Sequence, residues 1–397
     1  MNPDHPVFPS LPVLAALLAL VLATLPAAAA DPQAAPAAEP TTAQIDPAIQ
    51  ALAMAEVWQR ELDQALRAHI DQLAIRGDAR SLAAAALLLL PDHADGDADA
   101  DEAWEAVIVQ RSAWLTAALA ADSGDPVLLW LGARGLPGSP AEPQQRATAL
   151  DELARFDPDN AAIWLDLMAQ ALADDQPARV DEYLQRAAQA SRFDAYELAV
   201  GQLLQDALAD FQAPPMPEDV RQVVAEQAAP GEAGAWLDHP EHARIFFIAS
   251  VLGMNAPLPF NTGCKPSLDN ALIVSRRSAC LAIAGRVAGD ARFVAARQVA
   301  LAMRLRLAGD LAGPAQVQRW REDYRDGLWQ VEQVQAVMQG REGKRLPGDH
   351  SRHAIAEGEH AAWLHALAAN GIPATAPDGW LPEQASARQL LGADDGG

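Results

Sequence analysis

The chain has little of several features that define common protein classes. Two cysteines, Cys264 and Cys280, are present among 397 residues, and they form no Cys-x-x-Cys motif. A scaffold held by many disulfides and a thiol–disulfide catalyst are therefore both excluded. Aromatic residues make up 5% of the chain. Sustained alternation of apolar and polar residues is almost absent, so no β-sheet is predicted.

Catalytic sequence motifs are also missing. The chain contains no His-Glu-x-x-His, no Gly-x-Ser-x-Gly and no Gly-x-Gly-x-x-Gly. The zinc proteases, serine hydrolases and dinucleotide-binding proteins that these motifs identify are accordingly not expected. We predict no catalytic residue and no cofactor, and we predict that the protein is not an enzyme.

Lysine is nearly absent, since Lys265 and Lys344 are the only two among 29 basic residues. The preference for arginine, together with abundant alanine, is typical of a GC-rich bacterial genome. The formal net charge is −24, and residues 31–260 carry 37 acidic against 13 basic side chains. Such a chain repels nucleic acids and anionic lipid headgroups, so neither is an expected partner.

The N-terminal segment is the longest apolar run. Its apolar part extends from Leu11 to Leu25, and the small residues before Asp31 suit a signal peptidase. We predict a signal peptide over residues 1–30, a disordered linker over 31–45, and a periplasmic or secreted protein that is not inserted in the membrane after cleavage. No lysine or arginine precedes Leu11. A misassigned start would explain this absence. An uncleaved anchor and a cytoplasmic protein are the alternatives to cleavage and export.

The two cysteines are expected to pair. An even cysteine count in an oxidising compartment favours a disulfide between Cys264, in a loop, and Cys280, inside a helix. Two buried free thiols are the alternative.

Helical patterns extend along the whole remaining chain. Capping residues followed by proline, and apolar residues at helical spacing, predict an all-α fold. One helix is expected from Asp269 to Ala288 and one from His350 to Asn370. The predicted organisation is a helical repeat domain over residues 46–213, a C-terminal helical domain over 214–383 and a flexible tail over 384–397.

Two tryptophans suggest how the first domain is built. Trp130 and Trp164 are separated by 34 residues, and Pro158 precedes the second by six. This is the period of helix–turn–helix repeats, and over residues 127–194 the pattern resembles the tetratricopeptide repeat. At this spacing we expect the tryptophans in the core rather than in a carbohydrate or peptide site.

The resemblance has departures and consequences. Leu153 stands where the repeat has a small residue, and Arg192 stands where it has proline, so the repeat is degenerate; an ordinary antiparallel helix bundle is the alternative. In tetratricopeptide arrays the first helix of each pair lines a concave groove. The resemblance implies a groove lined by Leu128, Leu131, Ala162, Leu165, Ala169 and Leu172.

The densest set of titratable residues lies near the C-terminus. On one continuous helix His350, His353, Glu357 and His360 would share an arc of about 80°. Imidazole and carboxylate groups on one face are ligands for zinc. Their spacing matches no metal motif of known mechanism, and Gly358 weakens the helix. A solvated face is therefore the favoured interpretation, and His353, Glu357 and His360 are weak metal candidates.

The predicted function is that of an exported helical-repeat protein which binds a protein or peptide or serves as a scaffold. Because the groove would be apolar with an acidic rim, the expected ligand is an apolar or basic peptide. The alternatives are a metal-dependent enzyme built on the His/Glu helix face and a structural envelope protein that self-associates.

Overall fold

The computed structural model describes residues 47–89, 100–136, 141–227 and 271–393, together with 241, 242, 244, 245, 248, 249, 252, 260, 263 and 264. Within these residues the fold is all-α, as predicted, and the structure holds no strand. The predicted signal peptide and linker lie outside the described residues. No helix in the described part of the chain has both the length and the apolar character needed to cross a membrane.

The first part of the chain forms helices whose starts follow the sequence signals. Asp78, Asp125 and Asn160 each accept a backbone N–H of the first helical turn, which is the usual role of an N-cap side chain. The helices of this part are α2 (Pro47–Arg76), α3 (Ala79–Leu88), α4 (Ala100–Ala121), α5 (Pro126–Arg134), α6 (Pro143–Phe156), α7 (Ala161–Ala173), α8 (Pro177–Gln189), α9 (Glu197–Ala207) and α10 (Glu218–Gln227).

The second part of the chain is helical as well, with two differences from the sequence prediction. The expected helix from His350 to Asn370 is two helices that meet at Gly358, and a short helix forms where a flexible tail is expected from residue 384. The elements are α14 (Ala271–Asp290), α15 (Val294–Leu307), α16 (Pro314–Met338), the 3-10 turn η1 (Arg341–Gly343), α17 (His350–Glu357), α18 (Glu359–Ala369) and α19 (Ala385–Leu391).

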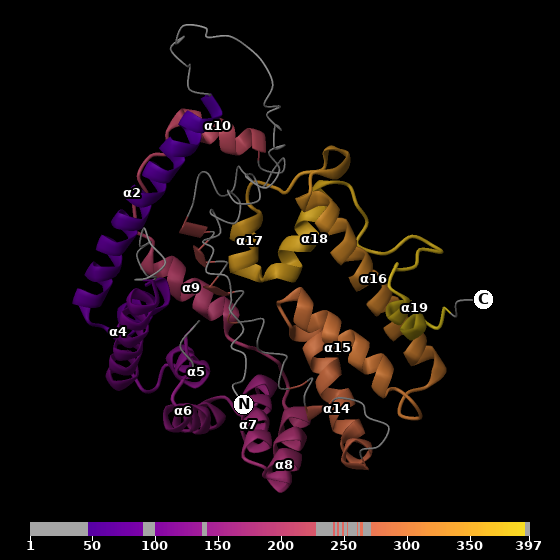
Figure 1. Ribbon diagram of the computed structural model, residues 1–397. Coiled ribbons are helices and arrows are strands. Elements are labelled where there is room, and N and C mark those ends of the chain that lie inside the picture. Colours follow the sequence, from indigo (N-terminus) through magenta and orange to yellow (C-terminus); the bar gives the residue numbers. More distant parts are fainter. Residues whose placement is uncertain are drawn as a thin grey trace, which may run out of the picture.

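Most helices pack against the next helix in the chain. The largest contacts are those of α3 with α4, α5 with α6, α7 with α8, α14 with α15, and α17 with α18. Each such pair is a helical hairpin that leaves one apolar face to cover. Figure 1 shows the hairpins following one another from α2 around to α16, with α17 and α18 between the two ends of this path.

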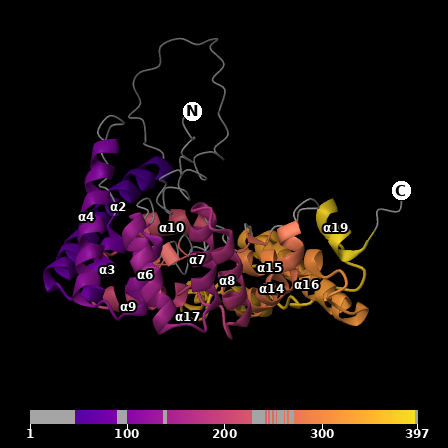
Figure 2. The same ribbon diagram turned by 90° about the horizontal axis from the view of Figure 1, so that it is seen from below.

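The early and late helices share a core. Helix α14 packs on α8, and α17 packs on α9. One cluster of buried residues extends from Leu66 in α2 to Ala387 in α19 and so continues across residue 213, the expected domain boundary. In the view from below, the early helices occupy one end of the molecule and most of the late helices the other (Figure 2). Helix α10, which follows the expected boundary, packs on α2.

The predicted disulfide between Cys264 and Cys280 is confirmed. The two sulfur atoms are 2.02 Å apart, and both side chains are fully buried. Cys280 lies within α14, as expected. The bond ties the segment before α14 to the core.

Candidate functional site

The predicted groove residues are mostly core residues in the structure. Leu128, Leu131, Ala162 and Leu165 are fully or almost fully buried, and Ala169 is half-buried. Among the six, Leu172 alone is exposed, at 36%. A buried side chain cannot line an open groove, so this part of the site prediction does not agree with the structure.

A later segment of the same chain covers this side of the hairpins. A Cβ added to Gly263 would lie 2.3 Å from the sulfur of Met168 on α7 and within 3.9 Å of Leu184 on α8. Glycine at this position therefore permits the backbone to approach the two helices closely. Phe260 and Cys264, on either side of it, are completely buried. The described residues of the disulfide-bonded segment therefore pack on the α7–α8 hairpin.

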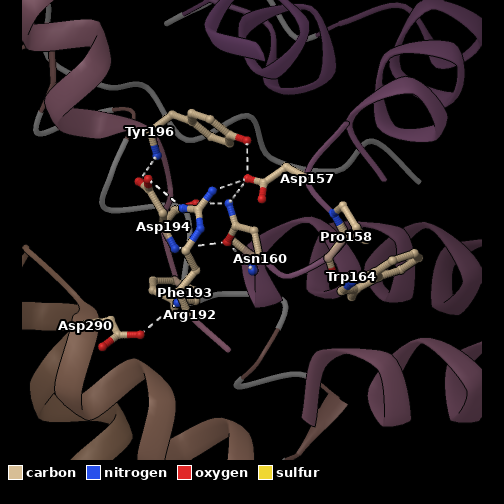
Figure 3. Close-up of polar contacts among 10 residues, drawn as sticks. Asp157, Pro158, Asn160, Trp164, Arg192, Phe193, Asp194, Tyr196 and Asp290 are labelled. Carbon is tan, nitrogen blue, oxygen red and sulfur yellow. Dashed lines mark hydrogen bonds and ion pairs between the residues drawn. The ribbon is translucent and has the colours of Figure 1, made fainter. Parts of the chain in front are cut away.

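The turn between α6 and α7 carries the most extensive polar network near the predicted repeats. Asp157 accepts hydrogen bonds from Asn160 Nδ2 at 3.1 Å and from Tyr196 Oη at 2.7 Å, and it forms an ion pair with Arg192 (Figure 3). Asn160 also exchanges hydrogen bonds with Asp194, donating to its carbonyl oxygen and accepting from its backbone N–H. These contacts join two turns that are 34 residues apart, one repeat period.

Arg192 is the residue that departs from the repeat pattern, and the structure explains it. Its backbone pairs with Asn160 in an isolated parallel bridge, and its guanidinium reaches both Asp157 and Asp194. Although burial lowers the pKa of Arg192, the carboxylates of Asp157 and Asp194 outweigh that effect and raise it. Proline would supply neither the guanidinium nor the backbone N–H that Asp159 accepts.

The network also holds one residue in an unusual conformation. Tyr196 has φ of +57°, in the left-handed region that non-glycine residues seldom adopt. Its backbone N–H donates to Asp194 Oδ1 at 2.8 Å. Burial and then the hydrogen bond to Asp157 raise the pKa of the Tyr196 hydroxyl, so it stays protonated and donates. Phe193 extends the connection, because its N–H donates to Asp290 at the end of α14.

Replacing Asp157 with asparagine tests the stabilising role of the network. The change removes the negative charge that pairs with Arg192. It can also turn the new amide N–H group toward Asn160 Nδ2 and Tyr196 Oη, which are themselves donors. We expect the free energy of unfolding to fall by about 1–2 kcal/mol, measured by urea denaturation. Asp151→Asn on the exposed side of α6 is the control, with an expected change within about 0.5 kcal/mol. Equal stabilities of the two variants would show that the network contributes nothing.

The aromatic side chain next to this network is open to solvent. Phe156, the last residue of α6, is 58% exposed, and it is the one aromatic residue among the large exposed apolar side chains of the described chain. Asp159, two residues into the turn that follows, is exposed as well. Trp164, by contrast, is buried, and its Nε1 donates to the Pro158 carbonyl at 2.7 Å. The two repeat tryptophans are core residues, as predicted.

The predicted histidine face is divided between two helices. Gly358 ends α17 with φ of +96°, and a Cβ there would lie 2.7 Å from Cβ of Arg292. His360 consequently belongs to α18, where its Nε2 faces Gln330 Oε1 at 3.2 Å, and burial lowers its pKa to about 4. The arc that requires one continuous helix does not exist, and among the described residues the weak metal candidates His353, Glu357 and His360 do not form one group of ligand atoms.

A different set of groups converges at the same place. Because α18 returns along α17, the rings of His365 and His353 meet, with centroids 4.2 Å apart and planes inclined by 32°. Both rings direct Nε2 at Asp349, at 3.1 Å for His365 and 3.3 Å for His353. His353 Nδ1 faces Glu357 Oε1 at 3.0 Å. The sequence analysis missed His365 because, on one continuous helix, His365 would not lie on the face of His353. Gly358 was the sequence signal that the chain reverses between the two residues.

Comparisons of the chain with protein-family models, with curated proteins and with solved structures gave no match.

Proposed function

We propose that the protein is an exported helical-repeat protein that binds a protein or peptide partner and acts as a scaffold. The observation that carries this proposal is the exposed Phe156 beside an acidic turn whose backbone the Asp157 network holds in place. Aromatic anchors contribute much of the energy of protein–protein contacts, and a rigid surface loses little entropy on binding.

The partner that fits this surface is basic as well as apolar. Residues 31–260 carry an excess of 24 negative charges. Close to the anchor in sequence, Asp159 is exposed, whereas Asp157 is already paired with Arg192. A lysine or arginine side chain next to an apolar residue would complement the Asp159 carboxylate. Because Leu128, Leu131, Ala162 and Leu165 are buried, the proposed contact lies on the turn between α6 and α7 instead.

Two further elements of the proposal rest on separate observations. The buried Cys264–Cys280 disulfide supports an oxidising compartment and hence export. The succession of helical hairpins, and the network that joins positions 34 residues apart, support degenerate tetratricopeptide-like repeats. A mass spectrum of the protein from its own envelope fraction tests the first element. The expected mass begins at Asp31 and lacks the two thiol hydrogens.

Binding can be tested with defined synthetic peptides. We expect a fluorescein-labelled peptide of alternating arginine and leucine to raise its anisotropy on addition of the protein, and a peptide of alternating glutamate and leucine not to do so. Replacing Phe156 with serine should weaken binding of the basic peptide about tenfold, equivalent to about 1.4 kcal/mol. Asp159→Asn should weaken it less and reduce its dependence on salt.

Leu311→Ser is the matched control, because Leu311 is a large apolar residue of 44% exposure in the late part of the chain. The Leu311→Ser variant should bind the basic peptide with the same affinity as the unaltered protein. Equal binding of the basic and acidic peptides, or unchanged binding by the Phe156 variant, would contradict the proposed surface.

A further inference from the structure

We propose that Asp349, His353 and His365 bind a divalent transition metal ion of the zinc class, with Glu357 orienting His353. Among the described residues, these three groups bring their ligand atoms within 4.8 Å of one another. Neutral imidazole and carboxylate are the ligand types that zinc takes in proteins besides thiolate. The proposal is independent of partner binding at Phe156.

The distances between the ligand atoms fit one ion. A metal about 2.0–2.1 Å from each of its ligands in tetrahedral geometry separates them from one another by about 3.3 Å. Asp349 Oδ1 lies 3.1 Å from His365 Nε2, and Asp349 Oδ2 lies 3.3 Å from His353 Nε2. An ion can therefore enter with small side-chain rotations, while α17 and α18 stay in place.

The orientation of His353 matches that of a metal-bound histidine. Its Nδ1 faces the Glu357 carboxylate and its Nε2 faces the Asp349 carboxylate. A metal ion on Nε2 would leave the Nδ1 proton directed at Glu357 Oε1. In metal sites a carboxylate commonly accepts the second N–H of the ligating imidazole in this way.

The two imidazole rings lie close enough to serve one ion. Their centroids are 4.2 Å apart, and the ring planes are inclined by 32°. A divalent ion shared by both Nε2 atoms would place its positive charge against the Asp349 carboxylate. This aspartate stands at the N-cap position of α17, yet its side chain forms no capping hydrogen bond. Its oxygens face the imidazoles instead.

The site is accessible to an ion from solvent. The side chains of Asp349, His353 and His365 are 35%, 29% and 38% exposed, which leaves a fourth position for water. Arg352 is the competing cation, with its guanidinium 3.5 Å from Asp349 Oδ2. That side chain is 69% exposed, so it can move away at little cost.

Zinc titration of the purified, untagged protein tests the proposal. After treatment with a chelator and dialysis, we expect isothermal titration with zinc chloride at pH 7.5 to show one ion per chain with a micromolar or tighter dissociation constant. Elemental analysis after a second dialysis should recover the same stoichiometry. Replacing His365 with glutamine should weaken binding at least tenfold, and Glu357→Gln should weaken it by about 10–100-fold through the lost orientation of His353.

His360→Gln is the matched control, because it removes an imidazole from the same helix as His365 but outside the cluster. It should leave zinc binding unchanged. Absence of stoichiometric zinc uptake by the unaltered protein would overturn the proposal, as would equal effects of the His365 and His360 substitutions. Asp349→Asn and His353→Gln should also abolish zinc binding. If either variant does not fold, the result for His365→Gln alone tests the proposal, because the His365 side chain is more than a third exposed.

Discussion

Replacing Leu165 with aspartate is expected to prevent the protein from folding. Leu165 on α7 is completely buried. The substitution removes a buried leucine, which costs about 2–5 kcal/mol, and places an unpaired carboxylate in the core at a cost of several more. The total is comparable to the whole stability of a folded domain. Far-ultraviolet circular dichroism and gel filtration of the variant should show loss of helix and of compactness.

Leu172→Asp on the same helix is the matched control. Leu172 is exposed, so the added carboxylate stays in water. The free energy of unfolding of this variant should lie within about 0.5 kcal/mol of that of the unaltered protein. Both positions belong to the groove that the repeat resemblance implies. A folded Leu165→Asp protein that lost only ligand binding would restore the open groove and contradict the core described here.

Replacing Glu197 with glutamine should stabilise the protein above pH 7. Glu197, the first residue of α9, is buried, and its Oε2 has no hydrogen-bond partner in the described structure. Burial, and to a smaller extent the nearby Asp194, raise the pKa of this carboxyl from 4.5 to about 7, although Arg292 opposes the rise. The ionised form is therefore the unfavourable one.

The direction of the pH effect follows from this shift. Below pH 4.5 the carboxyl is protonated in both folded and unfolded chains, and its stabilising contribution is fully present. That contribution is lost as the pH rises through about 7, where the folded protein also ionises. Glutamine mimics the protonated group. The variant should be more stable than the unaltered protein by about 3 kcal/mol at pH 8, and the difference should disappear near pH 4.

Urea denaturation of both proteins at each pH measures this difference directly. Burial lowers the pKa values of His350 and His360 to about 4, and the effect of these histidines on the pH dependence of stability has the opposite sign. Their contribution is the same in the Glu197 variant and in the unaltered protein, so the difference between the two proteins does not contain it. Glu182→Gln on the exposed face of α8 removes one surface ion pair with Arg186 and is the control, with an expected change in the free energy of unfolding of no more than about 0.5 kcal/mol. A constant difference between the Glu197 variant and the unaltered protein from pH 4 to pH 8 would disprove the raised pKa.

Much of the fold could be predicted because its signals are local. The caps Asp78, Asp125 and Asn160 start helices where the sequence indicates, and the cysteine count predicted the disulfide. Burial of Trp130 and Trp164 followed from their apolar neighbours. These features depend on residues close in the chain or on a count, so one sequence is enough to find them.

The candidate site was harder to predict because it depends on chain reversal and distant packing. One glycine, Gly358, decides whether His353 meets His360 or His365. Likewise, Leu165 has the spacing of a groove residue, and periodicity cannot show that Gly263 will lie against the hairpin of α7 and α8. The Asp157 network was missed since its partners, Arg192 and Tyr196, are 35 and 39 residues away.

The close approach of Gly263 to α7 and α8 has a consequence for the order in which the protein forms. Met168 and Leu184 leave the ribosome well before Gly263, which covers them. Chains generally begin folding from the N-terminus during synthesis, and exposed apolar surface favours aggregation. Helices α7 and α8 can pair early, but their inner face stays uncovered until the cysteine-containing segment arrives. A nascent chain that has been synthesised only as far as α10 thus exposes to chaperones an apolar surface on α7 and α8 that is buried in the finished protein.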